Sequence, residues 1–289
     1  MPRNLTRNLF AIIILVPALS VVARAQTSTP TSAPAPAATA QETATPAPPL
    51  DPEVDKILTR LEQRNVHDLR AKLKWVLRYV IEDDEEPDVK LGTIWYKQTE
   101  PVAKFKVQFD AKLAGTRKRN LDEQHLFDGR WYVECQSQTK TITRREIYRP
   151  DEKINPYKLG EGAFPLPFGQ KKADILREFE VHRLDSKTDD PPDTDHLRLI
   201  PRPDTSTGRT YKTLDFWVSR ASDLSGLPVK VVAGKKDGTG AVNSQIEITF
   251  SDVQLNLGLS DTVFEIATPS GYEEVVERLD DVPAPPTQP

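Results

Sequence analysis

Apolar residues fall on alternate positions in three stretches between residues 69 and 135, and this period of two is typical of β-strands. In the first stretch the apolar positions of one parity are Leu69, Ala71, Leu73, Trp75, Leu77, Tyr79 and Ile81. Lysines and arginines take most of the positions between them. A helix would need apolar residues three and four apart, which these do not supply. We therefore expect a long strand with one dry face.

The same alternation returns twice in this part of the chain. One repeat is Phe105, Val107, Phe109 and Ala111; the other is Trp131, Val133 and Cys135, which follows an Asp128-Gly129 dipeptide suited to a hairpin turn. A strand is also expected at 89–96, and further strands at 140–148, 179–184, 197–201, 213–219, 229–233 and 242–253. The fold class predicted is mainly β, a single antiparallel, unclosed half-barrel of about eleven strands.

Two helices are expected beside this sheet. Asp51-Pro52-Glu53 is a typical helix start, and Val54, Ile57, Leu58 and Leu61 then make an apolar stripe. A short helix is predicted at 171–179. The Gly- and Pro-containing stretch 159–169 before it is expected to be an apolar lid whose glycines serve as hinges.

The ends of the chain have a different composition. Residues 1–25 pair Arg3 and Arg7 with an apolar run and the ending Ala23-Arg24-Ala25, which predicts a signal peptide cleaved after Ala25, with an uncleaved anchor as the alternative. Residues 26–50 form a Pro/Ala/Thr linker, 51–279 the folded domain and 280–289 a disordered tail. The net charge is −4, and loss of the signal removes three arginines and no acids. Nucleic acid and anionic lipid head groups are therefore not expected as partners of the whole surface.

No catalytic or metal-binding motif is found in the sequence. The four histidines, His67, His125, His182 and His196, are scattered without ligand spacing, and no G-x-S-x-G, C-x-x-C or phosphate-binding loop occurs. Cys135 shares its parity with Trp131 and Val133, which favours a core position over a nucleophile. The acidic run 82–88 has no glycine, so it is interpreted as a solvated hairpin tip and not as a calcium loop. We expect no enzyme, no cofactor and no metal site.

A sheet this wide with only two modest helices has more apolar inner surface than the helices can cover. A closed core is the ordinary alternative for any single residue, but for the whole set we predict a cavity for an apolar ligand. The expected acyl-chain-binding residues are Leu73, Trp75, Leu77, Tyr79, Ile94, Phe105, Val107, Phe109, Trp131, Phe164, Leu166, Phe168 and Phe216.

The motifs also resemble those of the LolA/LolB-type periplasmic lipoprotein carriers, in order along the chain and over about residues 54–275. They are the strand with Gly92, Trp95 and Lys97, the Phe105-Lys106-Val107 segment, the Asp128-Gly129 hairpin before Trp131-Tyr132, and the closing Phe264, Pro269 and Gly271. The resemblance implies an unclosed barrel with helices over an apolar cavity.

The function that this resemblance implies is a soluble, monomeric periplasmic carrier that shields the acyl chains of lipoproteins or another lipid. Its implied partners are an inner-membrane lipoprotein-releasing transporter and an outer-membrane acceptor. Family carriers place an arginine after the strand lysine, whereas Gln98 stands there in this chain, so no latch arginine is carried over. Two alternatives stay open: a lipid-sensing regulatory domain that engages a membrane protein, and a secreted enzyme of unknown type.

Overall fold

The computed structural model describes residues 50–80, 86–99, 103–148 and 168–279. Its helices are α1 (Pro52–Gln63), α2 (Lys172–Glu178), α3 (Ser206–Thr210) and the 3₁₀ turn η1 (Asp261–Phe264). Its strands are β1 (Asp68–Tyr79), β2 (Asp88–Lys97), β3 (Lys104–Ala114), β4 (Arg117–Phe127), β5 (Trp131–Gln136), β6 (Thr141–Glu146), β7 (Phe179–Leu184), β8 (Thr194–Pro201), β9 (Tyr211–Ser219), β10 (Pro228–Lys236), β11 (Val242–Leu255) and β12 (Glu273–Glu277).

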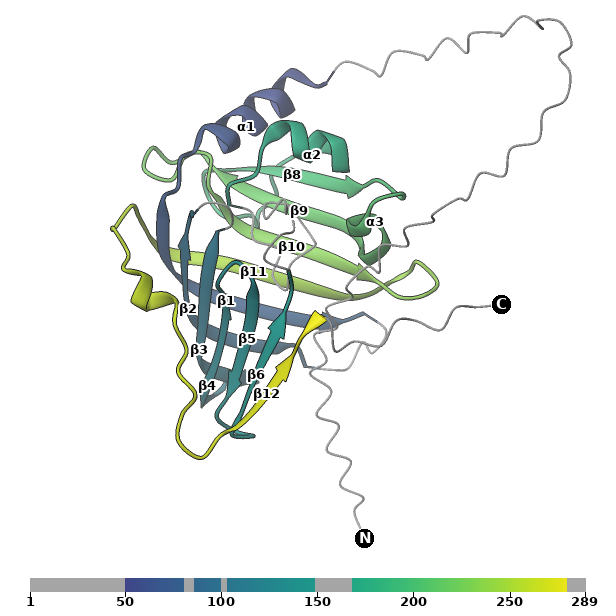
Figure 1. Ribbon diagram of the computed structural model, residues 1–289. Helices are drawn as coiled ribbons and strands as arrows, with labels where there is room; N and C mark the ends of the chain where they lie inside the picture. The colour runs from purple at the N-terminus through teal and green to yellow at the C-terminus, as the bar shows by residue number, and fades with distance from the viewer. Residues whose placement is uncertain (1–49, 81–85, 100–102, 149–167, 280–289) are drawn as a thin grey trace, which may run out of the picture.

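All twelve described strands belong to one sheet, in the order β12-β6-β5-β4-β3-β2-β1-β11-β10-β9-β8-β7. Every neighbouring pair is antiparallel except β6 and β12, which run parallel. The two outermost strands, β7 and β12, do not pair with each other, so the sheet curls without closing (Figure 1). The predicted fold class, an unclosed half-barrel with an N-terminal helix, is confirmed.

The predicted N-terminal helix begins where the sequence indicated. The carboxylate of Asp51 accepts a hydrogen bond from the Glu53 backbone amide at 2.8 Å, and Pro52 occupies the first turn. The apolar stripe of α1, which includes Leu58 and Leu61, is buried. Gly226 allows the loop before β10 to touch this helix, because a Cβ there would lie 2.4 Å from the Arg60 carbonyl oxygen. Helix α2 lies beside α1 at the β7 end of the sheet (Figure 1).

Two strands were not predicted from the sequence. Strand β4 begins with Arg117-Lys118-Arg119-Asn120, which lack the apolar alternation that identified the other strands; β3 pairs with it and supplies its place in the sheet. Strand β12 is exposed throughout its length and pairs only with β6 among the described strands. Both form because a neighbouring strand offers unpaired backbone groups, which local sequence does not reveal.

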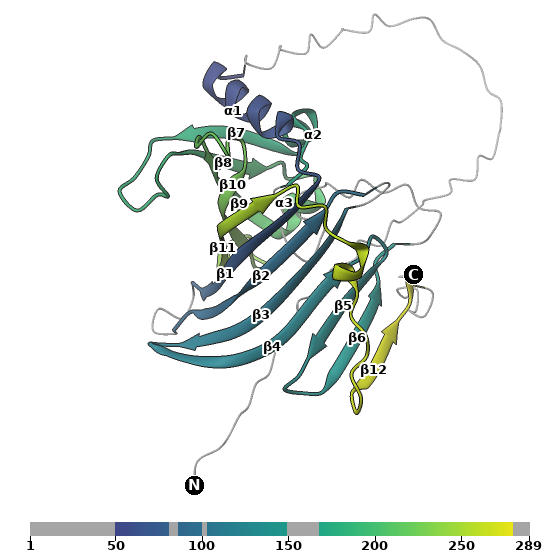
Figure 2. The same cartoon turned by 90° about the vertical axis from the view of Figure 1, so that its left-hand side faces the viewer.

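The curled sheet buries side chains on both faces. On the concave face one core cluster joins α1, α2 and strands β7–β10, and a second joins β1–β5 and β11. On the convex face a third cluster joins β4–β6 with Phe264 and Ile266 of the C-terminal segment, which crosses the outside of the sheet with η1 before β12 (Figure 2). The half-barrel therefore has an outer covering that the alternation in the sequence did not predict.

The C-terminal segment is held to the convex face by hydrogen bonds. The buried carboxylate of Asp68 accepts from the backbone amides of Leu257, Gly258 and Leu259 at 2.6 to 3.1 Å. Lys97 Nζ donates to the Leu259 carbonyl at 2.8 Å. Charge-assisted bonds of this kind are about twice as strong as neutral ones, so they fix the path of a segment with little regular structure.

Candidate functional site

The structure places ten of the thirteen predicted acyl-binding residues on the concave face. They come from β1, β2, β3 and β9 together with the turn before α2: Leu73, Trp75, Leu77, Tyr79, Ile94, Phe105, Val107, Phe109, Phe168 and Phe216. Phe164 and Leu166 lie outside the described residues. These ten do not all share one environment, since the helices cover only part of this face.

Phe216 belongs to the part of the concave face that α1 and α2 cover. Its cluster includes Leu58 of α1, Ile175 of α2 and Leu214 of the same strand, all of them at most 1% exposed. Such a tightly closed cluster is an ordinary core. In this structure Phe216 is thus a core residue under the helices.

The second concave cluster contains no residue of a described helix. Its central part is buried, with Phe109 at 2% exposure, but exposure rises along β1: Trp75 and Leu77 are half-buried, and Tyr79 is 50% exposed. Phe168 packs on this cluster from the turn before α2, with its ring centroid 5.5 Å from Tyr96 and 5.2 Å from Phe250. The apolar surface left accessible on this face therefore lies along β1.

Close approach of β2 and β3 under this cluster depends on Gly92. A Cβ at that position would lie 2.0 Å from the Gln108 carbonyl oxygen, at a bulge in the β2–β3 pairing. Any side chain there would push the two strands apart. This is the physical reason for the glycine that we noted from the sequence.

Trp131 lies on the convex face, away from the other predicted residues. It packs with Trp95, Val133 and Cys135 in the cluster covered by Phe264 and Ile266. The alternation along β5 was read correctly, but its buried face is the outer one, because the C-terminal segment covers it and Tyr132 points to the concave side. Cys135 is buried, as expected, and burial raises the pKa of its thiol.

A charged network on the concave wall was not predicted. Lys90 Nζ donates to both carboxylate oxygens of Glu123 at 2.7 Å, and His125 Nε2 lies 2.6 Å from Glu123 Oε1. His125 Nδ1 is 2.8 Å from the Tyr132 hydroxyl. Lys90, Glu123, His125 and Tyr132 are all buried, and Lys90 Nζ lies within 5.5 Å of the ring centroids of Trp75 and Phe109.

The network keeps its charges because each has a partner. Burial opposes ionisation of Glu123, but the hydrogen bond from His125 and the charge of Lys90 outweigh it and lower the pKa of Glu123 to about 2. Burial, with the nearby charges of Glu134 and Glu123, raises the pKa of the Tyr132 hydroxyl well above its usual value. One tautomer of His125, with Nε2–H donating to Glu123 and Nδ1 accepting from the Tyr132 hydroxyl, accounts for both of its hydrogen bonds.

One sequence signal could have revealed this network. Lys90 shares the parity of Ile94 and Tyr96 on β2, and the residues opposite it on β1 are apolar, so a lysine at that position interrupts a dry face. A charge on a dry face needs a partner, and Glu123-x-His125 supplies one only once β4 is recognised as a strand. The missed strand therefore explains the missed network.

The concave wall thus combines accessible apolar surface along β1 with paired charges beside it. Among the described residues no group of His, Cys, Asp and Glu is arranged to hold a metal ion. None of the helices in the described ranges has the length and apolar character needed to cross a membrane. The class that fold and site define is an open β half-barrel with an amphipathic concave face.

Comparison with known proteins found similarities among solved structures. No protein-family model matches the sequence, and no curated protein matches it either. Among solved structures, an uncharacterized conserved protein from Thermus thermophilus is similar at 10% identity and a TM-score of 0.43, covering 78% of this chain and 99% of its own.

Two further similar structures bear names related to the resemblance noted in the sequence. A putative outer membrane lipoprotein-sorting protein domain from Vibrio parahaemolyticus has 15% identity and a TM-score of 0.38, with 74% of this chain and 95% of that chain covered. A LolA superfamily protein from Nitrosomonas europaea has 14% identity and a TM-score of 0.35, with 73% and 97% covered. None of these likenesses transfers a functional residue to this chain.

Proposed function

We propose that the protein binds acyl chains against the β1 side of the concave face and carries lipoproteins or other acylated lipids through the periplasm. The observation that supports this is the accessible apolar surface of Trp75, Leu77 and Tyr79 beside a cluster that no described helix covers. Each acyl CH₂ removed from water contributes about 0.8 kcal/mol, so a wall of this kind can hold a chain reversibly.

The charged network suits an amphipathic ligand that has a polar group at one end of its acyl chain. Lys90 and Glu123 lie on the same wall as Trp75, and the Lys90 ammonium, which is bonded to Glu123, is 5.5 Å from the centroid of the Trp75 ring. A second ion pair, Lys112 Nζ to Asp88 Oδ1 at 2.9 Å, lies at the neighbouring position of β2 and β3. An acyl chain along β1 would have its polar end near these pairs.

The tryptophans allow a direct test, because they are divided between the faces. Trp75 is on the concave face, whereas Trp95 and Trp131 are in the convex cluster and Trp217 stacks on His196 at 4.1 Å on the convex side of β9. A fatty acid with a spin label on its chain quenches a nearby indole. We expect quenching to persist in W95F/W131F/W217F and to be lost in W75F.

Quenching that follows the convex tryptophans in a folded protein would contradict the proposed site. A second test uses Leu77→Asp, which puts a charge on the half-buried part of β1, with Leu257→Asp as the control, since Leu257 is 50% exposed on the C-terminal segment. Native mass spectrometry of delipidated protein should show acylated peptide bound to wild type and to Leu257→Asp only. Equal binding by all three would contradict the proposal.

Carriage is a separate step that binding alone does not establish. We expect the exported protein to take an acylated lipoprotein from inner-membrane vesicles and to release it to outer-membrane vesicles. Bound lipid that never leaves the protein, with co-purification of an inner-membrane regulator, would instead indicate a sensory domain.

A further inference from the structure

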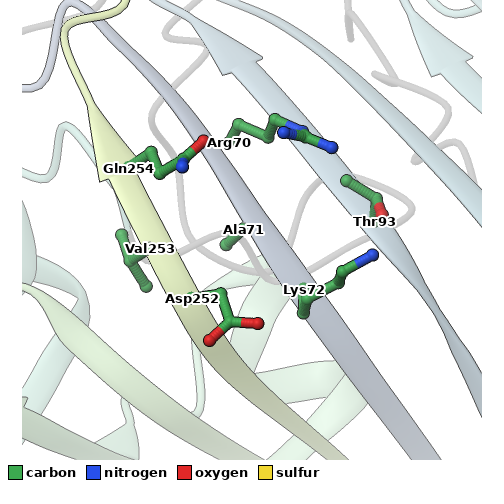
Figure 3. Close-up of a pocket in the computed structure, with 7 residues that line it drawn as sticks. All are labelled: Arg70, Ala71, Lys72, Thr93, Asp252, Val253 and Gln254. Atoms are coloured by element: carbon green, nitrogen blue, oxygen red, sulfur yellow. The ribbon is translucent and has the colours of Figure 1, made fainter.

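The convex face carries a pocket of about 510 Å³ that is separate from the acyl site (Figure 3). It lies over the central strands β11, β1 and β2, and it is lined by Arg70, Ala71, Lys72, Thr93, Asp252, Val253 and Gln254. It is large enough for a molecule the size of a sugar, since ligand sites usually measure about 300–1,000 Å³.

A β-bulge opens this pocket. The pairing of β1 with β11 shifts between Arg70 and Lys72, and on the opposite strand Asp252 has a left-handed backbone with φ of 50°. At this bulge β11 has one more residue than β1, which separates the two strands locally. The side chains of Arg70 and Lys72, on either side of the bulge, therefore border a hollow. The pocket thus follows from the backbone itself.

Two cations and a hydroxyl meet on one side of the pocket. Lys72 is directly opposite Thr93 in the β1–β2 register, and Figure 3 shows Arg70 and Lys72 both extending across β2 toward Thr93. Asp252 projects on the other side of β1, from β11. On its far side Thr93 pairs with Gln108 of β3, which carries no charge. The local balance is two positive charges and one negative charge.

No hydrogen bond or ion pair with any other described residue involves the Arg70, Lys72, Asp252 or Gln254 side chains. Three other cations on this face are engaged: Lys97 and Lys106 donate to carbonyls of the C-terminal segment, and Lys230 pairs with Glu247. Arg70 and Lys72 have no such partner among the described residues, and they are the two cations that line the pocket, in a chain of net charge −4.

We propose that this pocket binds a phosphate group of a phosphorylated ligand. The planar guanidinium of Arg70 can donate two parallel hydrogen bonds to oxyanion oxygens, the Lys72 ammonium adds a point charge, and the Thr93 hydroxyl adds a donor. Asp252 and Gln254 then face the remainder of the ligand, where they accept from and donate to hydroxyl groups. The phosphate belongs either to a soluble phosphorylated molecule or to a phospholipid head group.

The test compares two double variants of the full chain that remove the same charge. R70Q/K72Q alters the pocket, and K74Q/K212Q removes two other exposed lysines that do not line it. Calorimetric titration uses glucose 6-phosphate and inorganic phosphate, with glucose as the uncharged comparison. We expect R70Q/K72Q to weaken phosphate binding about tenfold or more and K74Q/K212Q by less than about twofold. D252N should tighten binding, because it removes the nearby negative charge.

The source of the phosphate is decided with vesicles. Binding to phosphatidylglycerol vesicles but not to phosphatidylcholine vesicles, lost in R70Q/K72Q and undisturbed by glucose 6-phosphate, indicates a phospholipid head group. Binding of glucose 6-phosphate without vesicle binding indicates a soluble ligand. The proposal is overturned if wild type binds neither up to millimolar concentration, or if both double variants lose affinity equally. All substitutions lie on exposed positions, and circular dichroism should confirm an unchanged fold.

Discussion

The two halves of the concave face show how one sheet can hold a closed core and an accessible wall. Under α1 and α2, strands β7–β10 present aliphatic and aromatic residues that are fully buried, such as Leu214 and Phe216. Across β11, strand β1 presents Trp75 and Leu77 half-buried and Tyr79 at 50% exposure, next to the paired charges of β2 and β4. Apolar alternation is the same in both halves, and what differs is the cover.

The largest expected effect is a loss of stability on substitution in the helix-covered half. Phe216→Ala should lower the free energy of unfolding by about 3–5 kcal/mol, because Phe216 is 0% exposed and its truncation leaves a cavity in a closed cluster. Urea denaturation measures it, with acyl binding expected to survive in the folded fraction. A loss under about 1 kcal/mol would mean that the helix-covered half is not a closed core.

The second prediction concerns the charged network. Glu123→Ala leaves the Lys90 ammonium buried without its carboxylate, and removing one partner of a buried pair costs about 3 kcal/mol or more. The double variant K90M/E123L removes both charges and should recover most of that loss. If the single and double variants are equally unstable by denaturant titration, the pair contributes packing and not charge compensation.

A third prediction follows from the pKa of Glu123. That pKa is about 2 in the folded protein against 4.5 as the ordinary value, so the unfolded chain takes up the proton first as the pH falls. The stabilisation is complete above about pH 4.5 and is lost as the pH falls toward 2, by up to about 3 kcal/mol. Glu123→Gln should remove this part of the pH dependence of unfolding. An unchanged acid slope in Glu123→Gln would refute the assignment.

The smallest effect on stability is expected on the accessible wall. Tyr79→Ser should change the free energy of unfolding by less than about 1 kcal/mol, since half of this side chain is already in water. Acyl affinity should nevertheless fall, which native mass spectrometry can follow. A variant that is destabilised as much as Phe216→Ala would show that β1 packs like the helix-covered half.

Much of the fold could be predicted because its signals are local. Period-two alternation located β1, β3 and β5, and the cap formed by Asp51 located the start of α1. Strand β4 was not predicted because Arg117, Lys118 and Arg119 follow no apolar alternation. The roles of Glu123 and His125 in the charged network were therefore not predicted either, since both lie on this strand. Ten of the thirteen predicted acyl-binding residues lie on the concave face; Phe164 and Leu166 lie outside the described residues, and Trp131 lies on the other face, where the C-terminal segment packs against it.

The sequence by itself determined which residues alternate, where turns and helix caps fall, and that the sheet has a long apolar side, because each depends on residues a few positions apart. Only the tertiary structure decided whether the apolar side chains of a strand lie on the concave or the convex face. A strand can be covered from either side, and segments distant in the sequence provide the cover. It also decided which polar groups come together: Lys90 with Glu123 on the concave face, and Arg70 with Lys72 and Thr93 on the convex face. Those meetings depend on register between strands, and register is fixed by packing over the whole sheet.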